Sequence, residues 1–169
     1  MSFTIRRLDP TDLPAVRALR LEALQAHPTA FGASYDTESK EELESYYRRL
    51  GNLIYVGGYV GDELVGISAL MPLPPGNSAH ITKLVSVYIQ EKARGTGMSS
   101  AMIQTLIGIA SRLKFEQIIL TVEAGNSHAS MLYERLGFVA YGRHPKSLKI
   151  AGRYYDELLM HLDLVAAGA

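Results

Sequence analysis

The amino-acid sequence predicts a single α/β domain built on a mixed β-sheet with helices on its faces. Stretches with a two-residue apolar period alternate with stretches whose apolar residues recur every three or four positions, in the order β-α-α-β-β-β-α-β-α-β-β. A chain of 169 residues is long enough for one well-filled core and short for two. We therefore expect residues 1–169 to form one domain.

The chain begins with a strand followed by the start of a helix. Residues 3–9 alternate in the manner of a strand, and Asp9 followed by Pro10 is typical of an N-cap and a first helical position. The expected helix has one apolar stripe, which also carries Arg20, and its apolar members are Leu13, Val16, Leu19, Ala23 and Leu24.

A loop and a second helix come next. Residues 29–38 have the small and turn-forming side chains of a loop. Ser39 with Glu42 three positions later predicts a capping box. The helix that it would start carries the apolar and aromatic residues Leu43, Tyr46, Tyr47 and Leu50.

The centre of the chain predicts three consecutive strands. Residues 53–60 and 63–71 flank Gly61-Asp62, a pair typical of a two-residue hairpin turn. A proline-rich break separates them from the third strand, residues 79–89. Alternation slips there at the apolar pair Leu84-Val85, and we expect a β-bulge at that point.

Another helix and another strand follow. The helix is indicated by apolar residues at helical spacing, namely Met98, Met102, Leu106, Ile109 and Leu113. In the strand, residues 117–123, the side chains of Ile118, Leu120 and Val122 share one face, which suits a core. The opposite face carries polar residues and suits a functional site.

The chain ends with a short helix and a pair of strands. Asn126 can cap the helix and Gly137 can end it. The two final strands, residues 139–145 and 153–164, turn around Ala151-Gly152.

Composition excludes several classes of function. Hydrophobic residues make up 47% of the chain and charged residues 20%, as in an ordinary globular protein. Lys+Arg and Asp+Glu number 17 each, which disfavours nucleic-acid binding. The absence of cysteine excludes disulfides and thiolate chemistry. No stretch has the length of a signal peptide core or a membrane span, so we expect a cytoplasmic protein without a membrane partner.

The junction between the third central strand and the following helix contains two glycines, Gly95 and Gly97, which follow the cationic residue Arg94. Backbone N–H groups at such a helix start, with Gly95 and Gly97 leaving room, can hold a phosphate or pyrophosphate, and Arg94 adds a fixed charge. A tight turn with a solvated Arg94 would use the same residues. A P-loop is excluded because Met98-Ser99 stands where it needs lysine and a hydroxyl residue.

A dinucleotide-binding site remains an alternative at this point. Its fingerprint needs a third glycine, and this chain has Ser100 there. Glu123, at the end of the next strand, nevertheless occupies a place that suits the acidic ribose-binding residue of such sites.

Two motifs taken together closely resemble the GNAT superfamily of acetyl-CoA-dependent N-acetyltransferases. Arg94, Gly95 and Gly97 match its pyrophosphate-binding motif, with Ser99 at a position where glycine or alanine is usual. The helix motif N-x-x-A-x-x-L-Y-x-x-x-G-F is matched without exception by Asn126, Ala129, Leu132, Tyr133, Gly137 and Phe138. The order of elements fits the family over nearly the entire chain.

The resemblance implies a mostly antiparallel twisted sheet whose central strands splay apart to admit the pantetheine arm of acetyl-CoA. Backbone groups of the bulged strand would bind that arm, and one N–H there would polarise the thioester carbonyl. The implied donor-binding residues are Val87, Tyr88, Ile89, Arg94, Gly95, Thr96, Gly97, Met98, Ser99, Asn126 and Tyr133.

The resemblance also implies a catalytic acid, Tyr133, whose phenol would reach the CoA sulfur. On the residues alone, Tyr133 could equally be a core tyrosine of its apolar stripe. Several members of the family carry the general base where this chain has Thr121, so Glu123 on the same strand face is the candidate base, and His80 is a weaker one. The other histidines, among them His27 and His128, are expected on the surface or in loops, and no metal site is expected.

We therefore expect an acetyltransferase that moves acetyl from acetyl-CoA directly to a primary amine in a ternary complex. Residues 27–38, the Gly61-Asp62 hairpin loop and residues 142–157 would wall the acceptor side. Asp36, Glu38 and Asp156 could attract a cationic amine there. The acceptor, a small molecule or a peptide N-terminus, stays open, and a homodimer is implied by the resemblance only. A non-catalytic acyl-CoA sensor and a nucleotide-dependent oxidoreductase are the alternatives.

Overall fold

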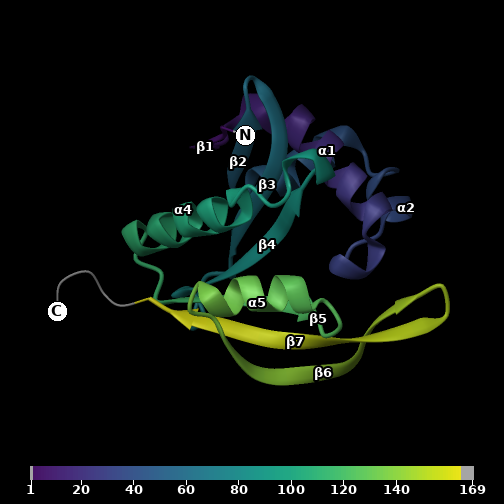
Figure 1. Cartoon of the computed structure of the whole chain (residues 1–169), viewed down its shortest axis with the longest axis vertical. Coiled ribbons are helices and arrows are strands. Elements are labelled where there is room, and N and C mark those ends of the chain that lie inside the picture. Colours follow the sequence, from purple (N-terminus) through teal and green to yellow (C-terminus); the bar gives the residue numbers. More distant parts are fainter. Residues whose placement is uncertain (1, 165–169) are drawn as a thin grey trace.

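A computed structural model describes residues 2–164, which form a mixed, seven-stranded sheet (Figure 1). The strand order is β1-β2-β3-β4-β5-β7-β6. Within these residues every neighbouring strand pair is antiparallel except β4–β5. The strands are β1 (Thr4–Arg7), β2 (Ile54–Val60), β3 (Glu63–Pro72), β4 (Ile81–Ile89), β5 (Gln117–Glu123), β6 (Val139–Ile150) and β7 (Arg153–Asp163).

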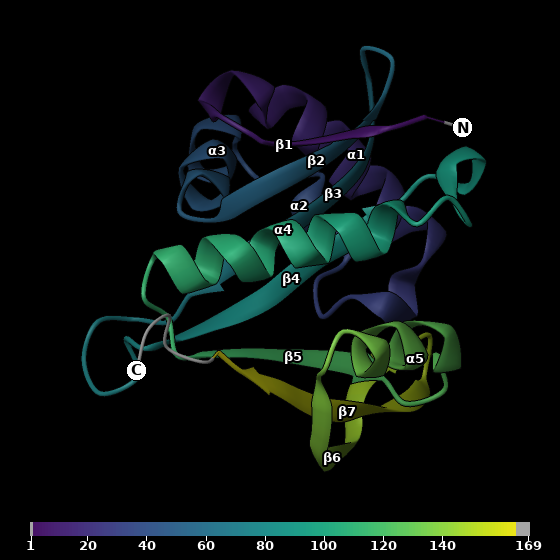
Figure 2. The ribbon, with the colours of Figure 1, turned by 60° about the vertical axis from the view of Figure 1, so that its left-hand side comes forward.

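Helices cover both faces of this sheet, as the sequence predicts (Figure 2). They are α1 (Leu13–Ala26), α2 (Tyr35–Glu38), α3 (Leu43–Gly51), α4 (Met98–Arg112) and α5 (Ser127–Arg135), with short 3-10 turns at Pro10–Asp12, Pro28–Ala30 and Glu91–Ala93. One core joins α4 and α5 to the sheet and includes Met102 and Leu106; the other joins α1 and α3 to the opposite face and includes Val16 and Tyr46.

The predicted caps are confirmed at Asp9 and corrected at Ser39. The Asp9 side chain accepts a hydrogen bond from Thr11 N, and Asp12 completes a capping box. Ser39 instead ends the one-turn helix α2, which lies inside the segment that we expected to be a loop. Helix α3 begins after Glu42 without a side-chain cap. Ser34 caps α2 because its hydroxyl accepts from Thr37 N.

Strands β4 and β5 separate soon after they meet. They pair only through residues 81–83 and 117–119, although β4 continues to Ile89 and β5 to Glu123. Figure 2 shows the two strands diverging from this common end. The splay that the resemblance implied is therefore present, and it leaves one edge of β4 without a partner strand.

The β-bulge of β4 lies at Ser86, and not at the predicted pair Leu84-Val85. Leu84 packs into the core under α4, whereas Val85 and Ser86 both face α1. Ser68 of β3 lies opposite two residues there, because Ile67 pairs with Tyr88 and Ala69 with Val85. Both faces of this strand are buried, so two adjacent apolar residues fit without any slip in alternation.

Two element boundaries also differ from the predicted ones. Leu113 lies past the end of α4 and is 48% exposed, because the helix ends at Arg112. Strand β6 continues to Ile150, beyond the predicted end at residue 145, since residues 148–150 pair with β7. Pro145 stands in an edge strand, where a missing N–H is tolerated.

The fit of α4 against β2 generates a stability prediction. A Cβ added at Gly58 would collide with Met98 Sδ and lie 2.9 Å from Met98 Cγ, and Met98 is buried. Gly58→Val should therefore lower the free energy of unfolding by about 1–3 kcal/mol, since overpacking forces a shift of the helix. The measurement is urea denaturation.

Gly51→Ala is the control for this variant. A Cβ at Gly51 meets nothing within 4 Å, so we expect a change within about 0.5 kcal/mol. Equal stability of Gly58→Val and the unaltered protein would contradict the close packing.

Candidate active site

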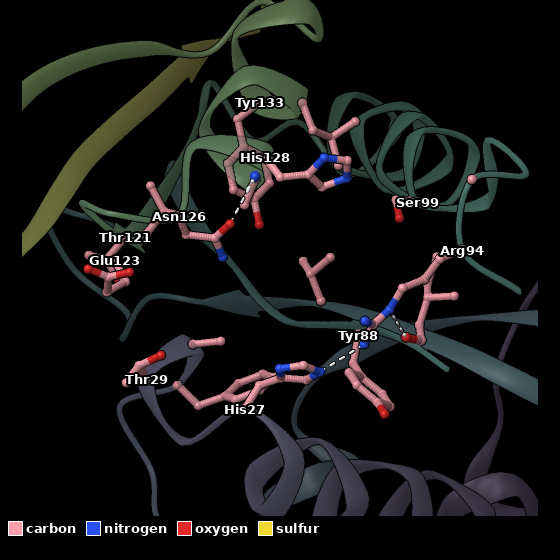
Figure 3. A pocket seen from close by; sticks show the side chains of 18 residues that line it. His27, Thr29, Tyr88, Arg94, Ser99, Thr121, Glu123, Asn126, His128 and Tyr133 are labelled. Atoms are coloured by element: carbon pink, nitrogen blue, oxygen red, sulfur yellow. Dashed lines mark hydrogen bonds between the residues drawn. The ribbon is translucent and has the colours of Figure 1, made fainter. Parts of the chain in front are cut away.

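The gap between β4 and β5 opens into a cavity of about 480 Å³ (Figure 3). Most of the predicted site residues line it, namely Val87, Tyr88, Ile89, Arg94, Gly95, Ser99, Glu123, Asn126 and Tyr133. They belong to β4, β5, α4 with the loop before it, and α5 with its N-cap. The separation of β4 from β5 places these segments around one cavity. Thr96, Gly97 and Met98 do not line the cavity: the Thr96 hydroxyl bonds to Ala93 O at 2.8 Å, and Met98 is buried under α4.

The start of α4 has the backbone form of an anion cradle. Gly95 and Gly97 have φ angles of 74° and 86°, a region that favours glycine, and an added Cβ at either would meet nothing within 4 Å. The open space means that a bulky anion can approach this backbone closely. The following helix contributes its positive end along 15 residues. Phosphate groups fit this position by shape and by charge.

The Arg94 side chain turns from this cradle across the cavity. Its Nε–H donates to Ile89 O at 3.2 Å, and its Nη2 lies 2.8 Å from His27 Nε2. A guanidinium only donates, so Nε2 of His27 is the acceptor in this contact. His27 lies in the loop after α1, in keeping with the expectation of a surface or loop residue, and it also lines the cavity.

The free edge of β4 directs backbone groups into the cavity. Gln90 N–H bonds to Val65 O on the β3 side at 2.9 Å, and successive strand residues alternate in direction. Ile89 and Val87 therefore point their N–H and C=O groups away from β3, toward the edge that β5 has left. The bond from Arg94 to Ile89 O agrees with this direction.

Tyr133 and Asn126 face this edge from α5. The Asn126 side chain accepts from Ala129 N at 3.1 Å, which confirms the predicted cap and fixes the start of α5. Tyr133 is 8% exposed, and its ring packs edge-on against Phe138 at 5.8 Å. Burial raises the pKa of the Tyr133 phenol to about 12, so the phenol keeps its proton at neutral pH.

The two predicted base candidates lie in different places. Glu123 lines the cavity beside Thr121, and its Oε1 accepts from Gly125 N–H at 2.8 Å (Figure 3). His80 is exposed ahead of β4 and does not line the cavity, because β4 and β5 are still paired at that end. His80 is therefore not placed to act there.

Several cavity residues were not predicted individually. His27, Thr29 and Phe31 follow α1, within the segment expected on the acceptor side, and His128 lies in the first turn of α5. Figure 3 shows His27 and His128 on opposite sides of the cavity. His128 occupies a variable position of the recognised helix motif, and the segment after α1 has no motif of its own. Only the fold brings these side chains to the site.

A second cavity of about 720 Å³ adjoins the first, and Phe31 lines both. It lies between residues 24–36 and residues 147–150, which belong largely to two of the three segments expected to wall the acceptor side. The third, the Gly61-Asp62 hairpin loop, lines neither cavity. Of the three predicted carboxylates, Asp36 lines this cavity. Glu38 is buried against Arg20, and Asp156 bonds to Arg143 and to Lys146 N–H, so neither is placed as predicted.

Residues 2–164 have neither a metal-binding cluster nor a membrane-spanning helix. These residues contain no group of three or more His, Cys, Asp or Glu side chains that could hold a metal ion. Their helices are too short or too polar to cross a bilayer.

Comparison with known sequences gives a consistent result. Residues 19–138 match the model of the acetyltransferase (GNAT) family. An L-methionine sulfoximine/L-methionine sulfone acetyltransferase of Pseudomonas paraeruginosa is 27% identical over 165 residues, 97% of this chain and 96% of that protein. A spermine/spermidine N(1)-acetyltransferase of Bacillus subtilis is 30% identical over 125 residues, 70% of this chain and 80% of that protein.

Solved structures show the same fold. A ribosomal-protein-alanine N-acetyltransferase from Brucella melitensis superposes with a TM-score of 0.78 at 24% identity, covering 95% of this chain and 99% of that one. A putative acetyltransferase from Salmonella typhimurium, solved with its cofactor acetyl-CoA, has a TM-score of 0.80 at 20% identity, covering 100% and 98%. A doubly wound dinucleotide fold is excluded for residues 2–164, because β4–β5 is the only parallel strand pair among them.

Proposed function

The chain belongs to the acetyltransferase (GNAT) family, and on this premise we propose that it transfers acetyl from acetyl-CoA to a primary amine of a small molecule or a protein N-terminus. The observation that carries the proposal is the cavity, which joins an open glycine backbone at a helix start, a free strand edge and a buried phenol. The glycine backbone suits a pyrophosphate, the free strand edge suits the extended pantetheine arm, and the phenol suits a leaving thiolate.

Donor binding divides between the two sides of the cavity. The backbone of residues 94–99 would hold the pyrophosphate, with Ser99 adding a hydroxyl donor. Val87 and Ile89 would bond to the pantetheine arm as a neighbouring strand does, with Tyr88 between them and Asn126 on the facing helix. Val87 N–H, beside the bulge, is the donor assigned to the acetyl carbonyl.

The chemical step needs a neutral amine and a way to relieve charge on the sulfur. As the amine nitrogen attacks the carbonyl carbon, Val87 N–H stabilises the charge that develops on oxygen. The nitrogen loses a proton to Glu123, directly or through water. When the C–S bond breaks, the Tyr133 phenol donates its hydrogen to the sulfur, and solvent or the proton from the amine restores the phenol.

Two relatives make two amine classes worth testing first. One acts on amino-acid analogues and the other on a polyamine, as their names state. The second cavity presents both Asp36 and Lys149, so it can complement an acceptor of either charge. A screen should measure free-thiol release with acetyl-CoA and L-methionine sulfone, spermidine or an alanine-initiated peptide.

The same screen tests the alternative of a non-catalytic sensor. Release of CoA with any of these amines supports the transferase. Tight acetyl-CoA binding without turnover across a broad amine panel would favour the acyl-CoA sensor instead, and absence of binding would contradict both.

The cradle generates a prediction at Gly97. Gly97→Val should reduce acetyl-CoA affinity by at least about a hundredfold in a calorimetric titration, because the side chain fills the space open to phosphate. Gly61→Val is the matched control, since Gly61 has a φ angle of 58° and open surroundings in a hairpin far from the cavity. It carries the same backbone strain, and retained affinity in both variants would refute the cradle.

Tyr133 generates a prediction that separates chemistry from packing. Tyr133→Phe keeps the ring against Phe138 and removes only the hydroxyl, so melting temperature and acetyl-CoA affinity should be preserved. The value of kcat should fall by about a hundredfold or more, the scale of losing a positioned acid. A near-normal kcat with a lowered melting temperature would make Tyr133 a core residue only.

Glu123 is expected to matter modestly. Its carboxylate is partly engaged by Gly125 N–H, and Glu123→Gln can keep that bond. We expect kcat/KM to stay within about tenfold because water can carry the amine proton. A far larger loss, with the pH profile displaced, would make Glu123 the indispensable base.

A further inference from the structure

A buried ionic network lies under the β4 bulge, outside the cavity. Arg20 of α1 donates from Nε to Glu38 Oε2 at 2.7 Å and from Nη2 to Glu38 Oε1, and its Nη1 donates to Ser86 Oγ at 2.6 Å. The Arg20 and Glu38 side chains are 12% and 6% exposed. Tyr46 O–H donates to the same carboxylate at 3.1 Å. One guanidinium therefore joins three elements: α1, α2 and β4.

The network carries its charge in a site that ordinarily disfavours charge. Burial alone would lower the pKa of Arg20, but the Glu38 carboxylate holds it above the usual value. Burial alone would raise the pKa of Glu38, but Arg20 and Arg49 hold it below the usual value. Buried ion pairs of this kind are weak stabilisers compared with packed apolar groups. An apolar side chain at position 20 could not form the directed hydrogen bonds that link Arg20 to Glu38 and Ser86.

Ser86 is the point where this network touches the sheet. It has a φ angle of 58°, which a residue with a side chain rarely adopts, and it is buried. Its hydroxyl accepts the Arg20 bond on the α1 side, where Val85 also points. The bond thus holds the extra residue of the bulge in place.

The bulge decides which backbone groups reach the cavity. One extra residue in a strand reverses the direction of every residue after it. With Ser86 in the bulge, the side chains of Val87 and Ile89 pack on the α4 side of the sheet and that of Tyr88 packs on the α1 side. The same alternation turns the backbone N–H and C=O groups of Val87 and Ile89 toward the free edge of β4. A relaxed bulge would turn the Val87 N–H away from the acetyl carbonyl.

The other end of the network reaches the acceptor side. Glu38 is the last residue of α2, whose Tyr35 and Asp36 line the second cavity. Arg17 Nη2 also donates to Ser39 O at 3.3 Å, so α2 is held to α1 at two points. The wall of the second cavity and the β4 bulge therefore share one anchor.

We propose that Arg20 is a positioning residue that aims the Val87 N–H at the acetyl carbonyl by holding Ser86 in the bulge, and that fixes α2 beside it through Glu38. The proposal rests on the acetyl-donor assignment made above. It gives Arg20 and Ser86 a role in the reaction although neither lines the cavity.

The test reads the carbonyl itself and needs no acceptor amine. Acetyl-CoA labelled with ¹³C at the carbonyl carbon is bound to the protein, and the isotope-edited infrared band is compared with that of free acetyl-CoA. In the unaltered protein, the band should lie at lower wavenumber because the N–H bond weakens the C=O bond. In Arg20→Lys and Ser86→Ala, the band should return more than halfway to the free position.

Affinity and turnover complete the comparison. The acetyl-CoA Kd should stay within about threefold, because the phosphate cradle is untouched. For any amine that turns over, kcat should fall by about tenfold to a hundredfold, as expected for a misdirected donor. Arg49→Lys is the matched control: Arg49 Nη2 lies 3.7 Å from Glu38 Oε2 and bonds to Glu41, so its band should not move.

Ser86→Gly is a second variant that keeps the test valid if Ser86→Ala fails to fold. Glycine adopts the positive φ angle without strain and still lacks the hydroxyl, so this variant should fold and its band should move. An unmoved band and normal kcat in Arg20→Lys and Ser86→Gly, with only melting temperature lowered, would overturn the proposal. Failure of the unaltered protein to bind acetyl-CoA would overturn the donor assignment itself.

Discussion

The site depends on a single constraint, the separation of β4 from β5 after three paired residues. Unpaired backbone groups inside a protein are costly, so a strand edge that is left open invites a partner. Here the edge faces a cavity and not another strand, and α5 closes the far side. The same splay places the start of α4, the phenol of Tyr133 and the loop after α1 around one space. Without it, these residues would lie on separate surfaces.

Local sequence rules predicted most of the elements because the relevant forces are local. The Asp9 and Asn126 side chains accept from backbone N–H groups two and three residues further on, and Gly137 adopts a positive φ angle, so each is found in its expected role. The predicted capping box at Ser39 is absent because Ser39 is the C-cap of α2, the helix that precedes it in the chain. The bulge lies at Ser86, whose hydroxyl accepts from Arg20, and local alternation could not indicate a contact between residues that are 66 positions apart.

The same distinction explains which site residues could be predicted. Arg94, Gly95 and Tyr133 belong to motifs whose chemistry is readable from spacing, and they line the cavity. His27 and Phe31 could not be found this way, since a histidine or phenylalanine in a loop has no direction until the loop is placed. Glu38 was wrongly predicted to attract a cationic amine. Its charge could be read from the sequence, but its buried ion pair with Arg20 could not.

Burial of Tyr133 has two effects on the proposed proton transfer that oppose each other. A pKa of about 12 keeps the proton on the phenol, which a hydrogen-bond donor needs. An ordinary thiol has a pKa of about 8.5, so full transfer to the thiolate is uphill at equilibrium. The overall proton transfer to sulfur is possible because the attacking amine loses a proton in the same reaction. Tyr133 then stabilises the sulfur by donation as charge develops, and the amine supplies the proton that finally remains on CoA.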